Sequence, residues 1–389
     1  MKKIDIFCEI IDNFGDIGVV YRLAKDLITK NYTVRILING FNELSMINKK
    51  IDNSKNIQII EKITYINMDK LSIDEIRNIE TSDIIIEAFA TYPNENYMNN
   101  IKNKKTLVLN LEYLSAERWV EDYHLVESLT GTENIKKYFF MQGFTNKTGG
   151  IVLGYEFLSK KNDNSISQKR DELVKKSINI TQEINFNNKK IISIFTYEYN
   201  FSSLIMSLNN IKQNFILLLF GEKTKKSFEI NLAIHERVDY FMDKNIEYIF
   251  LPFYDQNDFD IFMLTSNLNI VRGEESFIRA LLSEKPFIWH SYLQEKNLHM
   301  EKVDAFLEFY KDYFKNDDEY KIVLEIFHEF NNRLENKYNI NTKYDVFFKY
   351  LSLLFEKNTI YPNINKYLLE NCDLADNLDK FINKQINLI

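Results

Sequence analysis

The chain has 389 residues, more than one ordinary hydrophobic core accommodates, which predicts two domains. Hydrophobic residues make up 45% and charged residues 27%, a balance typical of soluble globular proteins. A net charge of -7 argues against a broad nucleic-acid surface, and the longest apolar runs, such as residues 215–220, are too short to span a membrane. Cys8 and Cys372 form no disulfide framework and no metal pattern, so we expect a reducing, cytoplasmic environment.

The first part of the chain predicts an α/β domain at residues 1–165. Continuous apolar runs are typical of strands covered on both faces. Such runs occur at residues 4–10, 32–38, 82–90 and 105–114. Between the first two runs, apolar side chains recur on one face of a predicted helix that ends near Ile28.

We expect the domain boundary in the zone formed by a segment with a glycine pair at 146–154 and a polar stretch at 160–172, after which a second alternation follows. Strands are predicted at 189–198, 214–222, 246–253, 268–273 and 286–291, with helices at 201–211, about 229–242, 256–267 and 276–285. Beyond about residue 295 the pattern is helical. We therefore expect a second α/β domain at 185–362, and a C-terminal helix at about 363–389 that packs back on the first domain.

Two carboxylates stand four residues apart in the segment DNFGDIG, which follows the first predicted strand. Gly15 and Gly18 let the chain turn, and the helix is expected to begin after Gly18. Ligands of doubly wound sheets bind beyond the carboxyl ends of the strands, so Asp12 and Asp16 are candidates for contact with a ligand. A structural explanation stays open, with Asp12 as a turn residue and Asp16 as an N-cap or first-turn acid.

The segment NIVRGEESFIRALL predicts a strand, a turn and a helix. Ser276 is expected to cap the helix, whose free N–H groups attract phosphate, and Arg272 could pair with a phosphate oxygen. Gly273 would let the backbone pass close to a ligand. Glu274 and Glu275 repel phosphate, but one of them could accept hydrogen bonds from sugar hydroxyls. Taken alone, the segment favours an ordinary capped helix with acidic first-turn residues.

A third segment, PFYDQNDFD, also follows a predicted strand. Phe253 and Phe259 could enclose a nucleobase, and Gln256 could bind its amide edge. Phe259 is equally well explained as a core residue, because three apolar residues follow it. Tyr197 ends another predicted strand and is expected near the same edge of the sheet.

No metal site is predicted. Asp258 and Asp260 match the short D-x-D pattern of metal-dependent glycosyltransferases, but they are predicted to lie on a helix rather than in a loop, so we interpret the match as accidental. His290 and His299 have no third ligand at a suitable spacing. Both are expected to make hydrogen bonds or to be structural.

Taken together, six segments resemble the motifs of the EarP family, the bacterial arginine rhamnosyltransferases of elongation factor P. The resemblance extends from Ile4 to about Leu307, and the ordered set is specific where no single motif is. In chain order the segments are DNFGDIGVVYRLA, NLEYLSAERW, GFTNKTGG, PFYDQNDFD, VRGEESFIRA and PFIWHSYLQEKNLHMEKVDAFL.

The resemblance implies a GT-B fold, an α/β architecture of two facing Rossmann-like domains with an interdomain cleft. It implies an inverting glycosyltransferase that moves L-rhamnose from dTDP-β-L-rhamnose to the guanidinium of one arginine of elongation factor P. The second domain would hold most of the donor, and the first would meet the protein acceptor. No metal or other cofactor, no nucleic acid and no membrane is expected to take part.

By position, the resemblance implies three catalytic carboxylates: Asp16 as general base, Asp12 as its companion and Glu274 as a third acidic residue. The carboxylate pair would hold the guanidinium in line with the anomeric carbon, and Asp16 would accept its proton. The remaining matched residues are implied in donor binding. They are Arg272, Glu275 and Ser276 for the diphosphate and ribose, Phe253 and Gln256 for thymine, and Tyr197 and Gly15 for other donor contacts.

The sequence departs from the family pattern at Glu275, where Asp is usual. Three alternatives stay open. The chain could be a GT-B enzyme with another nucleotide sugar or acceptor, which a donor screen would separate. It could be a non-catalytic module that binds elongation factor P or a nucleotide. A phosphohydrolase with Asp12 as nucleophile is disfavoured, because Asn13 and Phe14 do not complete the D-x-D loop of a Mg²⁺ site.

Overall fold

The computed structural model describes residues 2–10, 14–101, 105–131, 133–178, 184–236, 238–331, 340–356 and 362–386, with backbone alone for 340–342. The chain divides into two compact units. Unit 1 comprises Met1–Glu156 with Lys366–Ile389, and unit 2 comprises Phe157–Asn365. The sequence patterns placed the first boundary near 165 and the start of the returning segment near 363.

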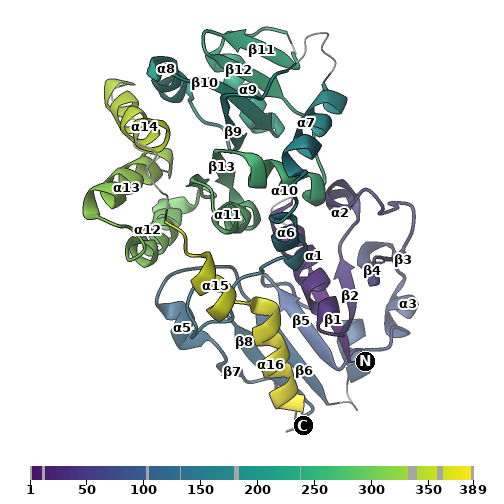
Figure 1. Ribbon diagram of the computed structural model, residues 1–389. Coiled ribbons are helices and arrows are strands. Elements are labelled where there is room, and N and C mark those ends of the chain that lie inside the picture. The colour runs from purple at the N-terminus through teal and green to yellow at the C-terminus, as the bar shows by residue number, and fades with distance from the viewer. Residues whose placement is uncertain are drawn as a thin grey trace. The chain divides into compact units, whose positions relative to one another are not determined.

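Unit 1 alternates strands and helices (Figure 1). Its strands are β1 (Lys3–Cys8), β2 (Thr33–Ile38), β3 (Ile57–Ile60), β4 (Ile63–Asn67), β5 (Ile84–Ala88), β6 (Thr106–Leu111), β7 (Glu127–Ser128) and β8 (Ile135–Phe140). Its helices are α1 (Gly15–Thr29), α2 (Asn42–Ile47), α3 (Ile73–Arg77), α4 (Glu95–Met98), α5 (Trp119–Tyr123) and α16 (Leu374–Ile386), with 3₁₀ turns η1 (Met68–Lys70) and η2 (Asn99–Ile101). The boundaries of the units fall in α6 (Tyr155–Lys160) and α15 (Asn365–Asn371).

The described strands of unit 1 form one sheet in the order β3-β4-β2-β1-β5-β6-β8-β7. Within it, β3 and β7 pair antiparallel with their neighbours, and the other neighbouring pairs are parallel. Strand β5 is buried at every residue, as its continuous apolar run predicted. Strands are added on one side of β1 up to β4 and on its other side from β5 onward. The loops after β1 and β5 therefore flank the topological switch point of this sheet.

The C-terminal helix α16 packs on unit 1, beside α1 (Figure 1). Leu378 and Ile382 are buried in the same hydrophobic cluster as Ile6 of β1. Lys30, which follows α1, forms an ion pair with Asp376 at 2.9 Å. The two ends of the chain therefore share one core.

Unit 2 contains a second sheet of the same type. Its strands are β9 (Lys189–Phe195), β10 (Asn214–Phe220), β11 (Tyr240–Asp243), β12 (Ile246–Phe250), β13 (Leu268–Arg272) and β14 (Phe287–His290). Its helices are α7 (Ile166–Ser177), α8 (Ser202–Asn210), α9 (Glu222–Asn231), α10 (Gln256–Thr265), α11 (Gly273–Leu282), α12 (Leu298–Lys311), α13 (Asp317–Asn331) and α14 (Ile340–Phe355), with the 3₁₀ turn η3 (Glu295–Asn297).

The described strands of unit 2 are ordered β11-β12-β10-β9-β13-β14, and only β11 among them pairs antiparallel. The chain adds β10 and β12 on one side of β9, then crosses back to add β13 and β14 on the other. The switch point of this sheet therefore lies between the carboxyl ends of β9 and β13.

The prediction of a helix at about 229–242 is wrong. Helix α9 already begins at Glu222, directly after Gly221, whose φ of +77° suits glycine. The later part of the segment forms β11, which pairs with β12 through a turn at Lys244 with φ of +52°. The local sequence pattern did not reveal β11, because this strand obtains its apolar contacts from β12, with which it pairs.

The polar stretch at 160–172 belongs to unit 2 and is largely helical, and the boundary between the units lies just before it, after Glu156. The buried residues of α7 are Arg170 and Val174, which lie four residues apart. The guanidinium of Arg170 lies over the ring of Phe186, 4.7 Å from its centroid. A narrow stripe is enough to pack this helix, so its composition remains polar.

Asp26 joins α1 to the start of α6. Its side chain is 2% exposed, and its two carboxylate oxygens accept hydrogen bonds from the backbone N–H groups of Gly154 and Tyr155, both at 2.8 Å. The N-terminal N–H groups of a helix have no partner within the helix, so a carboxylate supplied from another element stabilises this end.

We expect Asp26→Ala to lower the free energy of unfolding by about 1–3 kcal/mol, because two buried N–H groups lose their acceptor. Asp26→Asn should cost less, since one oxygen remains. Urea unfolding followed by circular dichroism measures the change. The matched surface variant Asp74→Ala should change stability by less than about 0.5 kcal/mol; an equal loss in both variants would contradict the assignment.

His124 follows α5 and packs against β8. Its Nδ1 accepts a hydrogen bond from the backbone N–H of Met141 at 3.2 Å, and its ring meets Phe140 edge-on at 4.8 Å. Burial lowers the pKa of His124 from its ordinary 6.5 to about 4. The folded protein therefore favours the neutral ring, whose Nδ1 can accept.

Between pH 6.5 and about 4 the unfolded chain binds a proton at His124 that the folded chain does not, so stability contributed by this residue is present above pH 6.5 and is lost as pH falls toward 4. We expect His124→Gln, which keeps a neutral acceptor, to reduce the slope of stability against pH in this window. Urea midpoints at several pH values measure it. Equal slopes in both proteins would contradict the prediction.

Candidate functional site

The loop after β1 lies at the switch point of unit 1 and is held by the loops that follow its two neighbouring strands. The backbone N–H of Glu9 donates to the Thr91 hydroxyl at 2.8 Å, and the N–H of Ile10 donates to Asn39 Oδ1 at 3.0 Å. Asp12 lies outside the described residues. The two anchors fix where the described part of the loop leaves the sheet.

Asp16 lies in the first turn of α1 and is 4% exposed. The expectation that the helix begins after Gly18 is wrong, because α1 begins at Gly15 and Gly18 already donates to the carbonyl of Phe14 at 3.0 Å. Burial, followed by the negative charges of Asp16 and Glu9, raises the pKa of the Cys8 thiol at the end of β1. Asp16 is therefore a carboxylate near the carboxyl end of the central strand, where the N-terminal dipole of α1 favours its negative charge.

The turn after β5 is a feature that the sequence did not reveal. Phe89 and Ala90 both have left-handed backbone, with φ of +56° and +58°, which costs energy for residues other than glycine. The ring of Phe89 stacks on Tyr113 at 4.7 Å, and Thr91 then reaches Glu9. Phe89 and Ala90 are not residues that favour left-handed backbone, so the sequence did not indicate a turn at this point.

In unit 2 the switch point holds a cation between aromatic rings. The guanidinium carbon of Arg272 lies 4.4 Å from the ring centroid of Phe195 and 4.8 Å from that of Tyr197. Such contacts restrict the orientation of the planar guanidinium, a group whose N–H fork matches the oxygens of phosphate and carboxylate. The structure thus brings together the predicted residues Arg272 and Tyr197, and adds Phe195, which the sequence alone assigned to an ordinary strand.

Helix α11 begins immediately after Arg272. Gly273 has φ of +65°, and a Cβ atom there would meet nothing within 4 Å, so the backbone is open to a ligand at this point. The indole N–H of Trp289 donates to the Gly273 carbonyl at 2.9 Å. Ser276 is not the N-cap that its position suggested, because its hydroxyl donates back to the Arg272 carbonyl from inside the helix.

The two acidic residues of the first turn of α11 have different partners. Glu274 forms an ion pair with Lys302 of α12 at 3.2 Å, and Glu275 forms one with Arg279 at 3.2 Å. Arg279 is 1% exposed, so its pair with Glu275 belongs to the interior of unit 2. Each carboxylate is therefore held by an ion pair to a basic side chain, and both residues lie next to the open turn at Gly273.

Phe253 and Gln256 lie three residues apart at the start of α10. Phe253 is 37% exposed, whereas Gln256 is buried. Asp255 caps the helix by accepting from the backbone N–H of Asp258 at 3.0 Å. Phe259 meets Phe220 edge-on at 5.1 Å and packs, partly buried, against the hydrophobic cluster of unit 2, in line with the second of its two interpretations.

The D-x-D match is structural: Asp258 and Asp260 lie on α10, and buried Asp260 pairs with Lys160 at 3.0 Å. His290 and His299 are buried apart from any cluster, and within the described ranges no three His, Cys, Asp or Glu side chains are grouped so that they could hold a metal ion. A search of the same ranges finds no helix long and apolar enough to cross a membrane.

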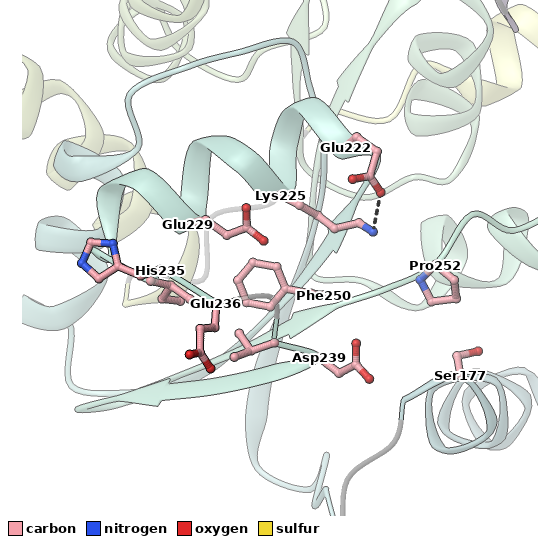
Figure 2. A pocket seen from close by; sticks show the side chains of 11 residues that line it. Ser177, Glu222, Lys225, Glu229, His235, Glu236, Asp239, Phe250 and Pro252 are labelled. Carbon is pink, nitrogen blue, oxygen red and sulfur yellow. Dashed lines mark hydrogen bonds and ion pairs between the residues drawn. The ribbon is translucent and has the colours of Figure 1, made fainter.

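A separate cavity of about 390 Å³ lies in unit 2 between α9, the start of β11 and the end of β12 (Figure 2). Lys225 points along it and donates to Glu222 at 2.9 Å, and Glu229, Glu236 and Asp239 are among the other residues that line it. These carboxylates do not suit a diphosphate. The predicted donor residues are not among those that line it.

A comparison with protein families identifies the chain. It matches the family described as Elongation-Factor P (EF-P) rhamnosyltransferase EarP over residues 4–383. The chain belongs to the EarP family. This confirms the resemblance found in the six sequence motifs and the predicted glycosyltransferase class.

Curated relatives named protein-arginine rhamnosyltransferase match most of the chain. The protein-arginine rhamnosyltransferase of Shewanella oneidensis is 33% identical over 333 residues, which make up 79% of this chain and 80% of that protein. That of Pseudomonas aeruginosa is 30% identical over 323 residues, 80% of this chain and 82% of that protein.

A solved structure that describes EarP-mediated arginine glycosylation of translation elongation factor EF-P matches with a TM-score of 0.62. The match covers 99% of both chains at 19% sequence identity, so it shows the fold alone. With the two doubly wound sheets described above, it confirms the predicted α/β fold of the GT-B class.

Proposed function

We propose that this protein transfers L-rhamnose from dTDP-β-L-rhamnose to the guanidinium of one arginine of elongation factor P, with inversion at the anomeric carbon. Membership of the EarP family supports the reaction class. The observation that carries the proposal is the stacked guanidinium of Arg272 beside the open start of α11, at the switch point of a doubly wound sheet. A diphosphate ligand suits this arrangement.

In the proposed donor site, Arg272 and the N–H groups at the start of α11 bind the diphosphate and stabilise the charge that develops as dTDP leaves. These groups supply positive potential without a metal ion, so we propose a metal-independent transfer. Exposed Phe253 packs on the thymine, and Gln256 binds its amide edge. Glu275, which follows the open turn, accepts hydrogen bonds from the ribose hydroxyls, and Glu274 beside it is the third acidic residue of the catalytic set.

In the proposed acceptor site, Asp16 is the general base. A free guanidinium has a pKa above about 12 and is a poor nucleophile, so a carboxylate must orient it and accept a proton as the C–N bond forms. The buried position of Asp16 supports this role, because a carboxylate with little water around it interacts strongly with a cation. Asp12 is proposed as the companion carboxylate that orients the guanidinium.

Asp16→Asn should lower the rate of transfer on the order of 10²–10⁴-fold while leaving dTDP affinity within about twofold, since it removes the proton acceptor but not the donor site. Intact-mass spectrometry of elongation factor P from the same organism, incubated with dTDP-rhamnose, measures the gain of one deoxyhexose. Asp74→Asn is the matched control, because Asp74 is also the second residue of a helix in unit 1. Near-normal turnover in Asp16→Asn would disprove the assignment of the base.

Arg272→Lys should weaken dTDP binding by about tenfold or more, since lysine keeps the charge but loses the planar fork that stacks on Phe195 and Tyr197. Isothermal titration calorimetry with dTDP measures the dissociation constant. Arg170→Lys is the control, because Arg170 also stacks on a ring in unit 2 but lies on α7. An unchanged constant in Arg272→Lys would place the diphosphate elsewhere.

A further inference from the structure

The segment that follows β14 is held by a buried asparagine from α13. Asn331 is 1% exposed, and its Oδ1 accepts a hydrogen bond from the backbone N–H of Ser291 at 2.7 Å. Its Nδ2 donates to the carbonyls of Trp289 and Phe327, both at 2.8 Å. In the described sheet β14 is an edge strand, so this amide makes the pair of bonds that a neighbouring strand would make.

A buried histidine extends the same attachment. His299, also 1% exposed, has its Nε2 atom 3.1 Å from the Asn331 carbonyl and its Nδ1 atom 3.3 Å from the backbone nitrogen of Gln294. A carbonyl only accepts and a backbone N–H only donates, so both bonds form together in the tautomer that carries hydrogen on Nε2. Ser291 and Gln294 are thus fixed by the side chains of Asn331 and His299, and the His299 ring is itself bonded to the backbone carbonyl of Asn331.

The segment between these two anchors carries Tyr292 to the Arg272 site. The ring of Tyr292 is 56% exposed, and it meets Tyr197 edge-on at 5.6 Å. Tyr197 in turn lies under the guanidinium of Arg272. An exposed ring gains little from burial, so its place against Tyr197 depends on the backbone that holds it.

We propose that Asn331 and His299 are positioning residues for the nucleotide donor, which fix the backbone from Ser291 to Gln294 so that Tyr292 stays against Tyr197 and bounds the donor site. This inference rests on the proposed function. Asn331 and His299 come from α13 and α12, which lie side by side in unit 2 (Figure 1), and they act through Tyr292 rather than on the donor itself. Loosening the loop should therefore weaken donor binding without touching the acceptor or the base.

A double-mutant cycle on dTDP affinity tests the inference. Asn331→Asp removes both Nδ2 donors and should raise the dTDP dissociation constant by about tenfold, since small displacements of a binding group are costly. In a Tyr292→Ala background the same substitution should change the constant by less than about twofold, because its effect passes through Tyr292. The matched control is Asn210→Asp, at the end of α8, where Nδ2 likewise donates to the carbonyl four residues earlier, at 2.9 Å.

A second pair of variants, at His299, tests the same inference if Asn331→Asp does not fold. His299→Ala should weaken dTDP binding, and His299→Gln, whose amide has both a donor and an acceptor, should restore most of it. His328→Gln on the exposed side of α13 is the control. In both sets the KM for elongation factor P should stay within about twofold of the unsubstituted protein, because the loop is proposed to act on the donor alone.

The outcomes separate the two proposals. If the unsubstituted protein binds no dTDP, the proposed function fails and the inference fails with it. If it binds dTDP but the folded His299 and Asn331 variants bind equally well, or if the effects of Asn331→Asp and Tyr292→Ala simply add, the inference alone is overturned. Coupled effects with rescue by His299→Gln would support it.

Discussion

The parallel register of β9, β13 and β14 is the constraint on which the site of unit 2 depends. Ile270 pairs with Ile194 and Arg272 with His290, so the last residues of three strands end at one level of the sheet. Because hydrogen bonds fix this register, a shift of one residue would turn the Arg272 side chain to the other face and away from Phe195 and Tyr197. The stacked guanidinium is thus a consequence of strand pairing.

In unit 1 the strand order likewise brings a charged side chain to the switch point of the sheet, but this side chain is a carboxylate. The switch point lies between β1 and β5, and the helix that follows β1 brings Asp16 to the edge of the sheet. In unit 2 the corresponding edge carries Arg272 and the N-terminus of α11. In a proposed transfer from an anionic donor to a cationic acceptor, each unit supplies the charge that its own substrate requires.

Buried polar side chains hold the irregular segments of both units. Asp26 binds the backbone at the start of α6, and Asn331 with His299 binds the backbone after β14. Within the sheet of unit 1, Asp5 of β1 accepts two hydrogen bonds of 2.6 Å from the guanidinium of Arg35 on β2. Such groups are costly to bury unless they are fully bonded, so they specify one conformation for segments that hydrophobic packing would leave loose.

The sequence by itself determined most strands of both sheets and the helical position of the D-x-D match, and it placed the candidate residues Asp16, Arg272 and Tyr197 at strand ends, because these features depend on local apolar runs and on the residues that follow them. It misplaced the start of α1, the cap of α11 and the helix at about 229–242, where helix ends and a hairpin depend on backbone contacts that local patterns do not show. Only the tertiary structure decided that Phe195 lies against Arg272 and that Asn331 reaches Ser291. The reason is physical: these residues are far apart in sequence, and strand order and helix packing bring them together.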